Sequence, residues 1–188
     1  MRTLSACVKA CVGQARRRTT RWSRTFLQSL GFEGAGKFES HDASALIDTL
    51  NYKASFAFNN FTQFPGAGAF YISPLFFSGS PVSGFADAGM EDDEPPNEFA
   101  CSNGATLEEY VFILPVKMKI LAMPDNMTLK TANLIYKATC QLKGNQLTVS
   151  RHVTDTTRSN VCGPPFAAEY REFANKLLTN LKAQVVYK

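Results

Sequence analysis

The sequence predicts a mainly β fold, β-sandwich-like and antiparallel, with an N-terminal amphipathic helix and a C-terminal helix followed by a short strand. Apolar and polar residues alternate over several short segments, as half-buried strands require. Prolines and glycines separate these segments and exclude long helices from the middle of the chain. Hydrophobic residues make up 45% and charged residues 19% of the 188 residues, so the chain can bury a core.

The first predicted element is an amphipathic helix over Thr20–Leu30, because its apolar residues recur at helical spacing and Gly31 follows at the helix-ending position. The glycine-rich segment Gly31–Asp42 is predicted to be a loop. A half-buried strand follows at Asn51–Phe58. The residues on its apolar face are Tyr52, Ala54, Phe56 and Phe58.

Proline stops in the middle of the chain predict short strands. An acidic turn at Glu91–Pro96 is expected to lie in solvent. The aromatic, glycine-rich stretch Phe61–Phe85 is either part of the core, as buried aromatic residues usually are, or a docking surface. The predicted strands are Ala69–Ile72, Leu75–Phe77, Leu107–Leu114 and Lys117–Leu121.

A β-hairpin is the clearest local prediction. Its strands are Asn133–Leu142 and Gln146–Val153, and Gly144-Asn145 supplies the positive φ of the turn. His152 lies on the polar face of the second strand. The apolar face carries Leu134, Tyr136, Ala138, Cys140 and Leu142 on the first strand, and Leu147, Val149 and Val153 on the second.

The C-terminal helix is predicted to begin at Pro164-Pro165, because proline suits the first turn of a helix. Ala183–Tyr187 then forms a final strand. The apolar stripe of the helix consists of Phe166, Tyr170, Phe173, Leu177 and Leu181.

Basic residues are concentrated at the N-terminus. Seven lie in the first 24 residues without an acidic residue, and the rest of the chain carries a net charge of −3. We therefore divide the chain into a basic segment, 1–21, disordered or helical, and one mainly-β domain, 22–188. A nucleic-acid partner is not expected, because the basic cluster has no groove-reading motif and no interleaved aromatic residues. Contact with an anionic surface is open to Arg16, Arg17, Arg18 and Arg21.

Two of the five cysteines are candidates for a disulfide. Cys101 and Cys162 lie in turn-rich segments at strand ends, where they are either bridged or two unrelated thiols. Cys140 is expected to be a small core residue. A Cys101–Cys162 disulfide would imply an oxidising compartment.

No catalytic, cofactor-binding or metal-ligating motif is complete. The segment Gly31–Lys37 has the spacing of a phosphate-binding loop, but Phe38 follows where magnesium needs a hydroxyl. No C-x-x-C, H-x3-H or H-E-x-x-H pair is present to bring metal ligands together, so no metal or cofactor is expected. The alternative is a small cysteine hydrolase. It would use Cys101 or Cys162 as nucleophile and His41 or His152 as base.

The order of several motifs resembles the C-terminal region of large bacterial envelope proteins. These proteins combine an N-terminal β domain of unknown function, a transglutaminase-like core and a C-terminal β domain. The resemblance covers about 160 of the 188 residues. Its motifs are Leu30-Gly31-Phe32-x-Gly34-x-Gly36, Leu50-Asn51-Tyr52, Ile113-Leu114-Pro115, Met123-Pro124-Asp125-Asn126, the hairpin segment Leu142–Arg151, and Glu169-Tyr170-Arg171-Glu172-Phe173.

The resemblance implies a non-catalytic accessory domain, periplasmic or secreted, whose partner is a neighbouring domain or an envelope protein. The catalytic cysteine, histidine and aspartate of that family belong to a core upstream of this region, and no position here matches them. The chain starts without an export signal or that core, so we expect either part of a longer protein or a free-standing module.

Overall fold

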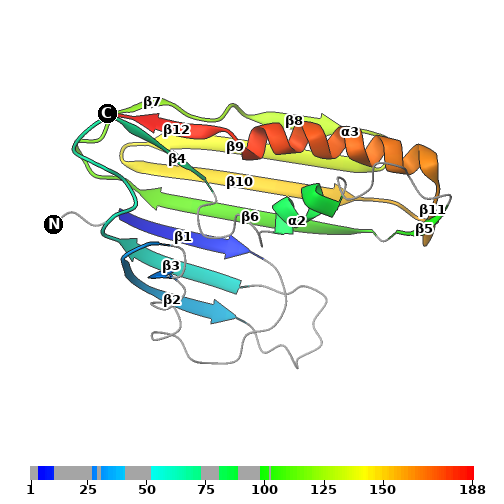
Figure 1. Ribbon diagram of the computed structural model, residues 1–188, viewed down its shortest axis with the longest axis horizontal. Coiled ribbons are helices and arrows are strands. Elements are labelled where there is room, and N and C mark those ends of the chain that lie inside the picture. The colour runs from blue at the N-terminus through cyan, green and yellow to red at the C-terminus, as the bar shows by residue number, and fades with distance from the viewer. Residues whose placement is uncertain are drawn as a thin grey trace.

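The structure is a computed structural model that describes residues 4–10, 27–28, 31–40, 52–72, 81–88, 98–101 and 103–188. These residues form a mainly β, antiparallel fold, as the sequence predicts (Figure 1). They build a seven-stranded, a three-stranded and a two-stranded sheet.

The seven-stranded sheet has the order β2-β3-β1-β6-β10-β9-β8, and all neighbouring strands are antiparallel. Described elements cover one face of this sheet, and on the other face no described element covers β6, β9 or β10. The strands are β1 (Leu4–Ala10), β2 (Gly34–Ser40), β3 (Tyr52–Phe58), β6 (Gly104–Ile113), β8 (Met127–Lys130), β9 (Leu134–Lys143) and β10 (Gln146–Asp155).

The cover consists of a small sheet at one end and helices at the other (Figure 1). The three-stranded sheet has the order β4-β12-β7, and a two-stranded sheet joins β5 to β11 beyond the helices. The elements are β4 (Gly68–Tyr71), β7 (Ile120–Ala122), β12 (Gln184–Tyr187), β5 (Phe99–Ala100), β11 (Val161–Cys162), α2 (Pro81–Ala88) and α3 (Pro164–Leu181).

Two hydrophobic clusters lie between the large sheet and its cover. The aromatic cluster joins the large sheet to the small one through residues such as Phe56, Phe112 and Val185. The helix-covered cluster joins the sheet to α2 and α3 through residues such as Tyr136, Val82 and Phe173. Because β9 and β10 contribute to both clusters, they form the common floor of the domain.

The predicted β9–β10 hairpin is confirmed. Gln146 pairs with Lys143 across a two-residue turn, and Gly144 has φ +61°. Period-two alternation places apolar side chains on the covered face, as predicted. Leu142 differs, because it lies at the end of β9 and is exposed.

The predicted loop at Gly31–Asp42 is wrong beyond its first residues, because Gly34–Ser40 forms β2 and pairs with β3 along its whole length. Gly31 does end a helix. It has φ +77°, its N–H donates to Gln28, and the N–H of Phe32 donates to the carbonyl of Leu27, which is a Schellman cap. In β2 a Cβ at Gly36 would overlap the Phe56 ring, so glycine lets the edge strand lie against a large aromatic residue.

Two further elements differ from the sequence prediction. Leu4–Ala10, part of the segment expected to be disordered or helical, forms β1 between β3 and β6. A strand at this position satisfies the backbone groups of both neighbours. The sequence also missed α2, which begins with Pro81 and buries Val82 and Ala86. With eight residues, α2 is short, so it agrees with the prediction that prolines and glycines exclude long helices from this part of the chain.

Several predicted features lie outside the described residues. They are the helix over Thr20–Leu30 apart from Leu27 and Gln28, the strand Leu75–Phe77, the acidic turn Glu91–Pro96, the arginine cluster Arg16–Arg21, and His41. No helix in the described part of the chain is long and apolar enough to cross a membrane.

Candidate functional site

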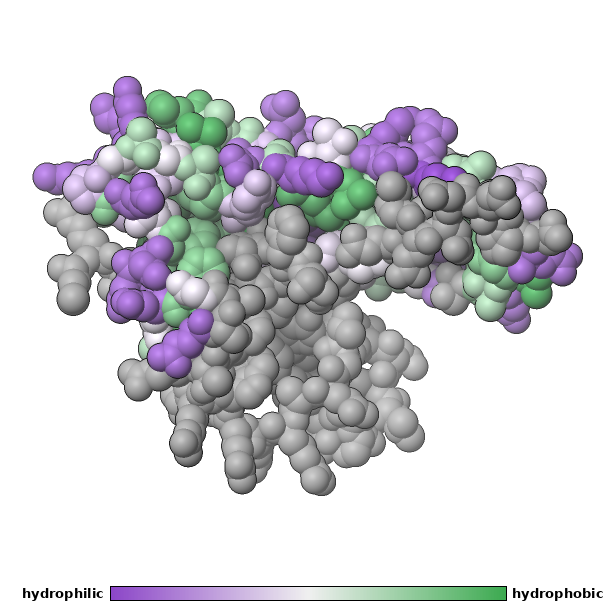
Figure 2. All heavy atoms as spheres, in the orientation of Figure 1, coloured by the Kyte–Doolittle hydropathy of each residue, from purple (hydrophilic) through white to green (hydrophobic). Residues whose placement is uncertain are grey.

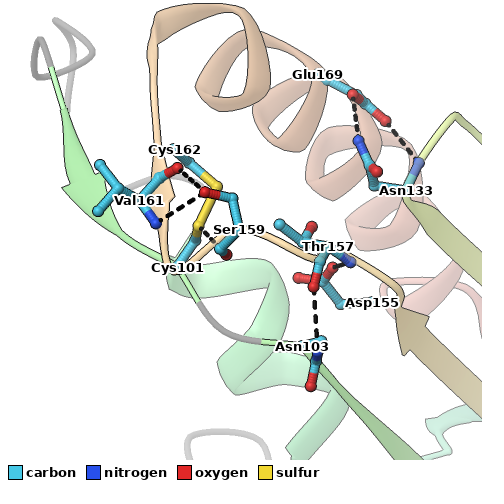
Figure 3. The surroundings of a disulfide bond; sticks show 9 residues. All are labelled: Cys101, Asn103, Asn133, Asp155, Thr157, Ser159, Val161, Cys162 and Glu169. Atoms are coloured by element: carbon cyan, nitrogen blue, oxygen red, sulfur yellow. Dashed lines mark hydrogen bonds between the residues drawn. A yellow bond between two sulfur atoms is a disulfide. The ribbon is translucent and has the colours of Figure 1, made fainter.

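A disulfide joins Cys101 to Cys162 close to the residues at which α3 begins (Figure 3). The Cα atoms are 5.8 Å apart, and the cysteines are separated by 61 residues in sequence. Cys162 ends β11 directly before α3, and Cys101 follows β5. The two strands pair antiparallel, with Cys162 opposite Phe99. The bond therefore ties the start of α3 to the chain that leads into β6, and it is typical of an oxidising compartment.

Backbone and side-chain contacts fix the loop around this disulfide. The N–H of Cys101 donates to the Asn160 carbonyl at 3.1 Å. The Sγ of Cys101 lies 3.0 Å from the carbonyl oxygen of Ser159, a contact without a hydrogen because a disulfide sulfur carries no proton. Asn103 donates to the Thr157 carbonyl at 3.1 Å. These contacts tie the chain around Cys101 and Asn103 to the segment 157–160.

The residues of the cysteine hydrolase alternative are not assembled among the described residues. The disulfide occupies the sulfur atoms of both Cys101 and Cys162, so neither can be a thiolate nucleophile in the oxidised protein. His152 is exposed on the outer face of β10, opposite Leu107 and Lys137, with its Nε2 atom 3.3 Å from the Thr154 hydroxyl. This exposed position is the one that the sequence predicts.

A buried pair of opposite charges was not predicted from the sequence. Glu108 on β6 is 0% exposed and Arg151 on β10 is 1% exposed. They are directly opposite each other in the strand register and share the covered face. Cross-strand neighbours in this position are close enough to interact. The pair lies at the border between the aromatic cluster and the helix-covered cluster.

Each charge of this pair contacts neighbouring structural elements. One carboxylate oxygen of Glu108 accepts the N–H of Val82 at 2.9 Å, and the other accepts the Tyr110 hydroxyl at 3.1 Å. Val82 is the second residue of α2, so Glu108 satisfies one of the backbone donors that a helix start leaves open. The Arg151 guanidinium carbon lies 5.9 Å from the centre of the Tyr110 ring.

Burial shifts the pKa values of nearby groups. It raises the pKa of Tyr136 to about 12, against an opposing effect of the Arg151 charge. The Tyr136 hydroxyl donates to Asn180 on α3 at 2.7 Å, which holds the neutral form in place. Burial also raises the pKa of Cys140, which makes this core thiol a poor nucleophile.

The sequence did contain a signal for the charged pair. Arg151 lies two residues from both Val149 and Val153, and Glu108 lies two residues before Tyr110. Strict alternation therefore puts both charges on the apolar face. Apolar residues alone do not reveal the pair, because the two charged residues stand at positions of the same period.

The aromatic stretch that was a candidate docking surface belongs to the core where it is described. Phe70 is buried, and Phe61 and Phe64 pack against the aromatic cluster. Tyr71 is the exception, with an exposed side chain on the outer face of the small sheet. The described residues contain no group of three or more histidine, cysteine or acidic side chains placed to hold a metal ion.

Comparison with protein-family models, curated proteins and solved structures gave no match for this chain.

Proposed function

We propose that the chain is a non-catalytic accessory domain, the C-terminal β domain of a periplasmic or secreted transglutaminase-like envelope protein, and that it docks on a neighbouring domain or an envelope protein. The placement of its reactive side chains supports this most directly. Glu108 holds the start of α2, and the sulfur atoms of Cys101 and Cys162 hold the start of α3. These groups maintain the fold and do not converge on a substrate.

The open face of the large sheet is the docking surface in this proposal. No outward-facing residue of β6, β9 or β10 is buried, so no described element covers these strands. Leu107 and Ile113 are exposed on β6, among polar residues of β10 and β9. A sheet face with scattered apolar residues and a polar surround fits a transient interdomain contact.

The small sheet over the aromatic cluster supports a β-sandwich-like description of this end of the domain. Val185 and Tyr187 on β12 point toward Phe112 and Val149 of the large sheet, and all four are buried in one cluster. Because a sandwich of this kind buries its two inner faces, it leaves the outer face of the large sheet for a partner.

The test is an activity assay combined with a binding assay. The oxidised chain should neither hydrolyse nor crosslink a glutamine peptide, and Cys101→Ala/Cys162→Ala should change nothing in that assay. In the full parent protein, Leu107→Ser/Ile113→Ser should loosen the contact between this domain and the preceding one, read as faster limited proteolysis of the linker. Turnover that disappears with the cysteine substitutions would support the hydrolase instead.

A further inference from the structure

Exposed aliphatic and lysine residues lie at one end of the domain. Figure 1 shows the β9–β10 turn, β7 and the C-terminus close to one another at this end. Figure 2 shows hydrophobic residues among hydrophilic ones over this end. We call this surface the rim. It consists of Val116, Lys117, Lys119, Leu121, Lys143 and Lys188, all of which are exposed.

Backbone hydrogen bonds hold the parts of the rim next to one another. Lys119 and Lys188 each donate a backbone N–H to the other's carbonyl at 2.9 Å. Two hydrogen bonds join Leu114 to Asn145 of the hairpin turn. The N–H of Leu114 donates to the Asn145 carbonyl at 2.8 Å, and the side-chain amide of Asn145 donates to the Leu114 carbonyl at 3.0 Å. The turn that contains Lys143 therefore adjoins the segment that contains Val116.

The aliphatic residues of the rim occupy positions that local structure does not require to be apolar. The N–H of Met118 donates to the Pro115 carbonyl at 2.9 Å, so Val116 and Lys117 are the central residues of a turn. Such positions favour glycine, asparagine, aspartate or serine. Val116 is nevertheless 85% exposed, the most of any large hydrophobic residue described.

A β-bulge exposes the second aliphatic residue. Val186 pairs with Ala122 and Tyr187 pairs with Ile120, which leaves Leu121 as the extra residue of β7. Bulges re-aim side chains at sheet edges. Leu121 is 56% exposed, whereas its neighbour Ile120 packs against the aromatic cluster.

The positive charge of the rim favours an anionic partner. Its four charged side chains are all lysines. Glu33 lies at the start of β2, separated from β6 by β3 and β1. Asp125 lies toward the end of α3, because its carbonyl accepts the Asn180 side chain. Lysine is depleted at the centres of protein interfaces but suits a membrane surface, where its stem lies along the acyl boundary and its charge meets headgroup phosphates.

We propose that the rim binds the surface of an anionic lipid bilayer, with Val116 and Leu121 inserted at the headgroup level and the four lysines against lipid phosphates. This surface lies at the edge of the domain and does not use the exposed apolar residues of the open sheet face. The proposal therefore goes beyond the docking function and does not depend on it.

The experiment is co-sedimentation of the full, oxidised chain with vesicles of phosphatidylcholine containing about one third phosphatidylglycerol. Each lysine near an anionic surface contributes about fivefold to binding, so Lys117→Gln/Lys119→Gln/Lys143→Gln/Lys188→Gln should weaken binding by more than about a hundredfold. The matched control removes four exposed lysines elsewhere and should keep most of the binding. It is Lys53→Gln/Lys130→Gln/Lys137→Gln/Lys176→Gln.

A second pair of variants tests the aliphatic contribution. Val116→Ser/Leu121→Ser should weaken vesicle binding about tenfold or more, because two apolar side chains no longer leave water. Val161→Ser removes an exposed aliphatic residue outside both the rim and the open sheet face and should leave binding unchanged. Near-ultraviolet circular dichroism of each variant verifies the native fold.

The arginine cluster needs its own control, since it could bind the same lipids. A chain with Arg16, Arg17, Arg18 and Arg21 replaced by glutamine should still lose vesicle binding when the rim lysines are replaced. Binding that depends only on the arginines would overturn the proposal. Equal binding to pure phosphatidylcholine would also overturn it. So would a rim-dependent change in oligomeric state without vesicle binding, which would assign the rim to a second copy of the chain.

Discussion

The two hydrophobic clusters lie on the same face of one sheet, yet they differ in polarity. The aromatic cluster consists mainly of apolar side chains, with rings in a continuous series from Phe58 through Phe61 and Phe70 to Phe112 at centroid distances of 5.1 to 5.5 Å. The helix-covered cluster contains polar anchors, such as the Tyr136–Asn180 hydrogen bond, and has the Glu108–Arg151 pair at its border.

The cover explains this difference. A small sheet satisfies its inner backbone groups within its own hydrogen-bond ladder, so it can lie on aromatic rings alone. A helix ends above the sheet and leaves N–H and C=O groups open at its termini. Glu108 accepts the Val82 N–H at the start of α2, and the Tyr170 hydroxyl donates to the Phe85 carbonyl near its end at 2.8 Å. The open backbone groups at the two ends of α2 therefore account for the buried Glu108 carboxylate and for the Tyr170 hydroxyl contact.

The largest expected effect comes from breaking the charged pair at the border. Arg151→Met should lower the free energy of unfolding by about 3–5 kcal/mol, because it leaves the buried Glu108 carboxylate without its opposite charge. Glu108→Leu/Arg151→Met should be less destabilised than the sum of the single variants. Urea denaturation of the four proteins in this double-mutant cycle measures the coupling. Strict additivity would mean that the two charges are independent.

Removing the disulfide should affect the helix-covered end alone. Cys101→Ser/Cys162→Ser should lower the free energy of unfolding by about 2–4 kcal/mol, since the bond closes a loop between cysteines separated by 61 residues. Hydrogen exchange should accelerate first in β5, β11 and the start of α3, with little change in the aromatic cluster. Reductant should destabilise the native protein and leave the double variant unchanged. Equal acceleration at both ends would show that they unfold as one unit.

Alkaline pH should weaken the helix-covered end through Tyr136. Its pKa is raised to about 12 in the folded state from 10 in the unfolded chain, so the folded protein keeps a proton that the unfolded chain loses. The stability from this group is fully present below pH 10 and is lost, by about 2–3 kcal/mol, as pH rises through 12. Tyr136→Phe should flatten this part of the stability profile. The remaining slope would belong to other tyrosines such as Tyr170, whose pKa burial also raises.

The smallest effects compare one tyrosine hydroxyl at each end. Tyr170→Phe removes the bond to the Phe85 carbonyl, and Tyr187→Phe removes the acceptor of the Gln63 N–H at 3.1 Å. Each substitution should cost about 1 kcal/mol in thermal or urea unfolding. Only Tyr170→Phe should increase hydrogen exchange in α2. The same increase with Tyr187→Phe would contradict the division into two ends.

Local chemistry made part of the fold predictable. The β9–β10 hairpin follows from alternation and the turn at Gly144, and the face of β3 follows from its aromatic spacing. In contrast, β1 and β2 depend on distant partners. In β2, Gly36 lies against the Phe56 ring and Gly34 lies against the Ala57 carbonyl, and no local pattern reveals these contacts.

The disulfide was predictable as a hypothesis because both cysteines lie in turns. The charged pair required attention to Arg151 within the alternating pattern. The role of Glu108 in the pair has no local signal, since the N–H that it accepts belongs to Val82 on α2, a helix that the local sequence pattern does not predict. The rim is likewise not predictable from local sequence. Leu121 belongs to an apolar strand in sequence, and only the bulge opposite β12 exposes it.

The position of β1 sets an order of events in folding. The β9–β10 hairpin closes across two residues, and hairpins of this kind form in about microseconds. β1 pairs with β6 across about one hundred residues of chain, and among the described strands it alone joins the β2-β3 pair to the rest of the sheet. Such distant pairing is slow. During synthesis the edge of β1 that pairs with β6 stays unpaired until β6 has been made, so this edge can pair with another strand in that interval.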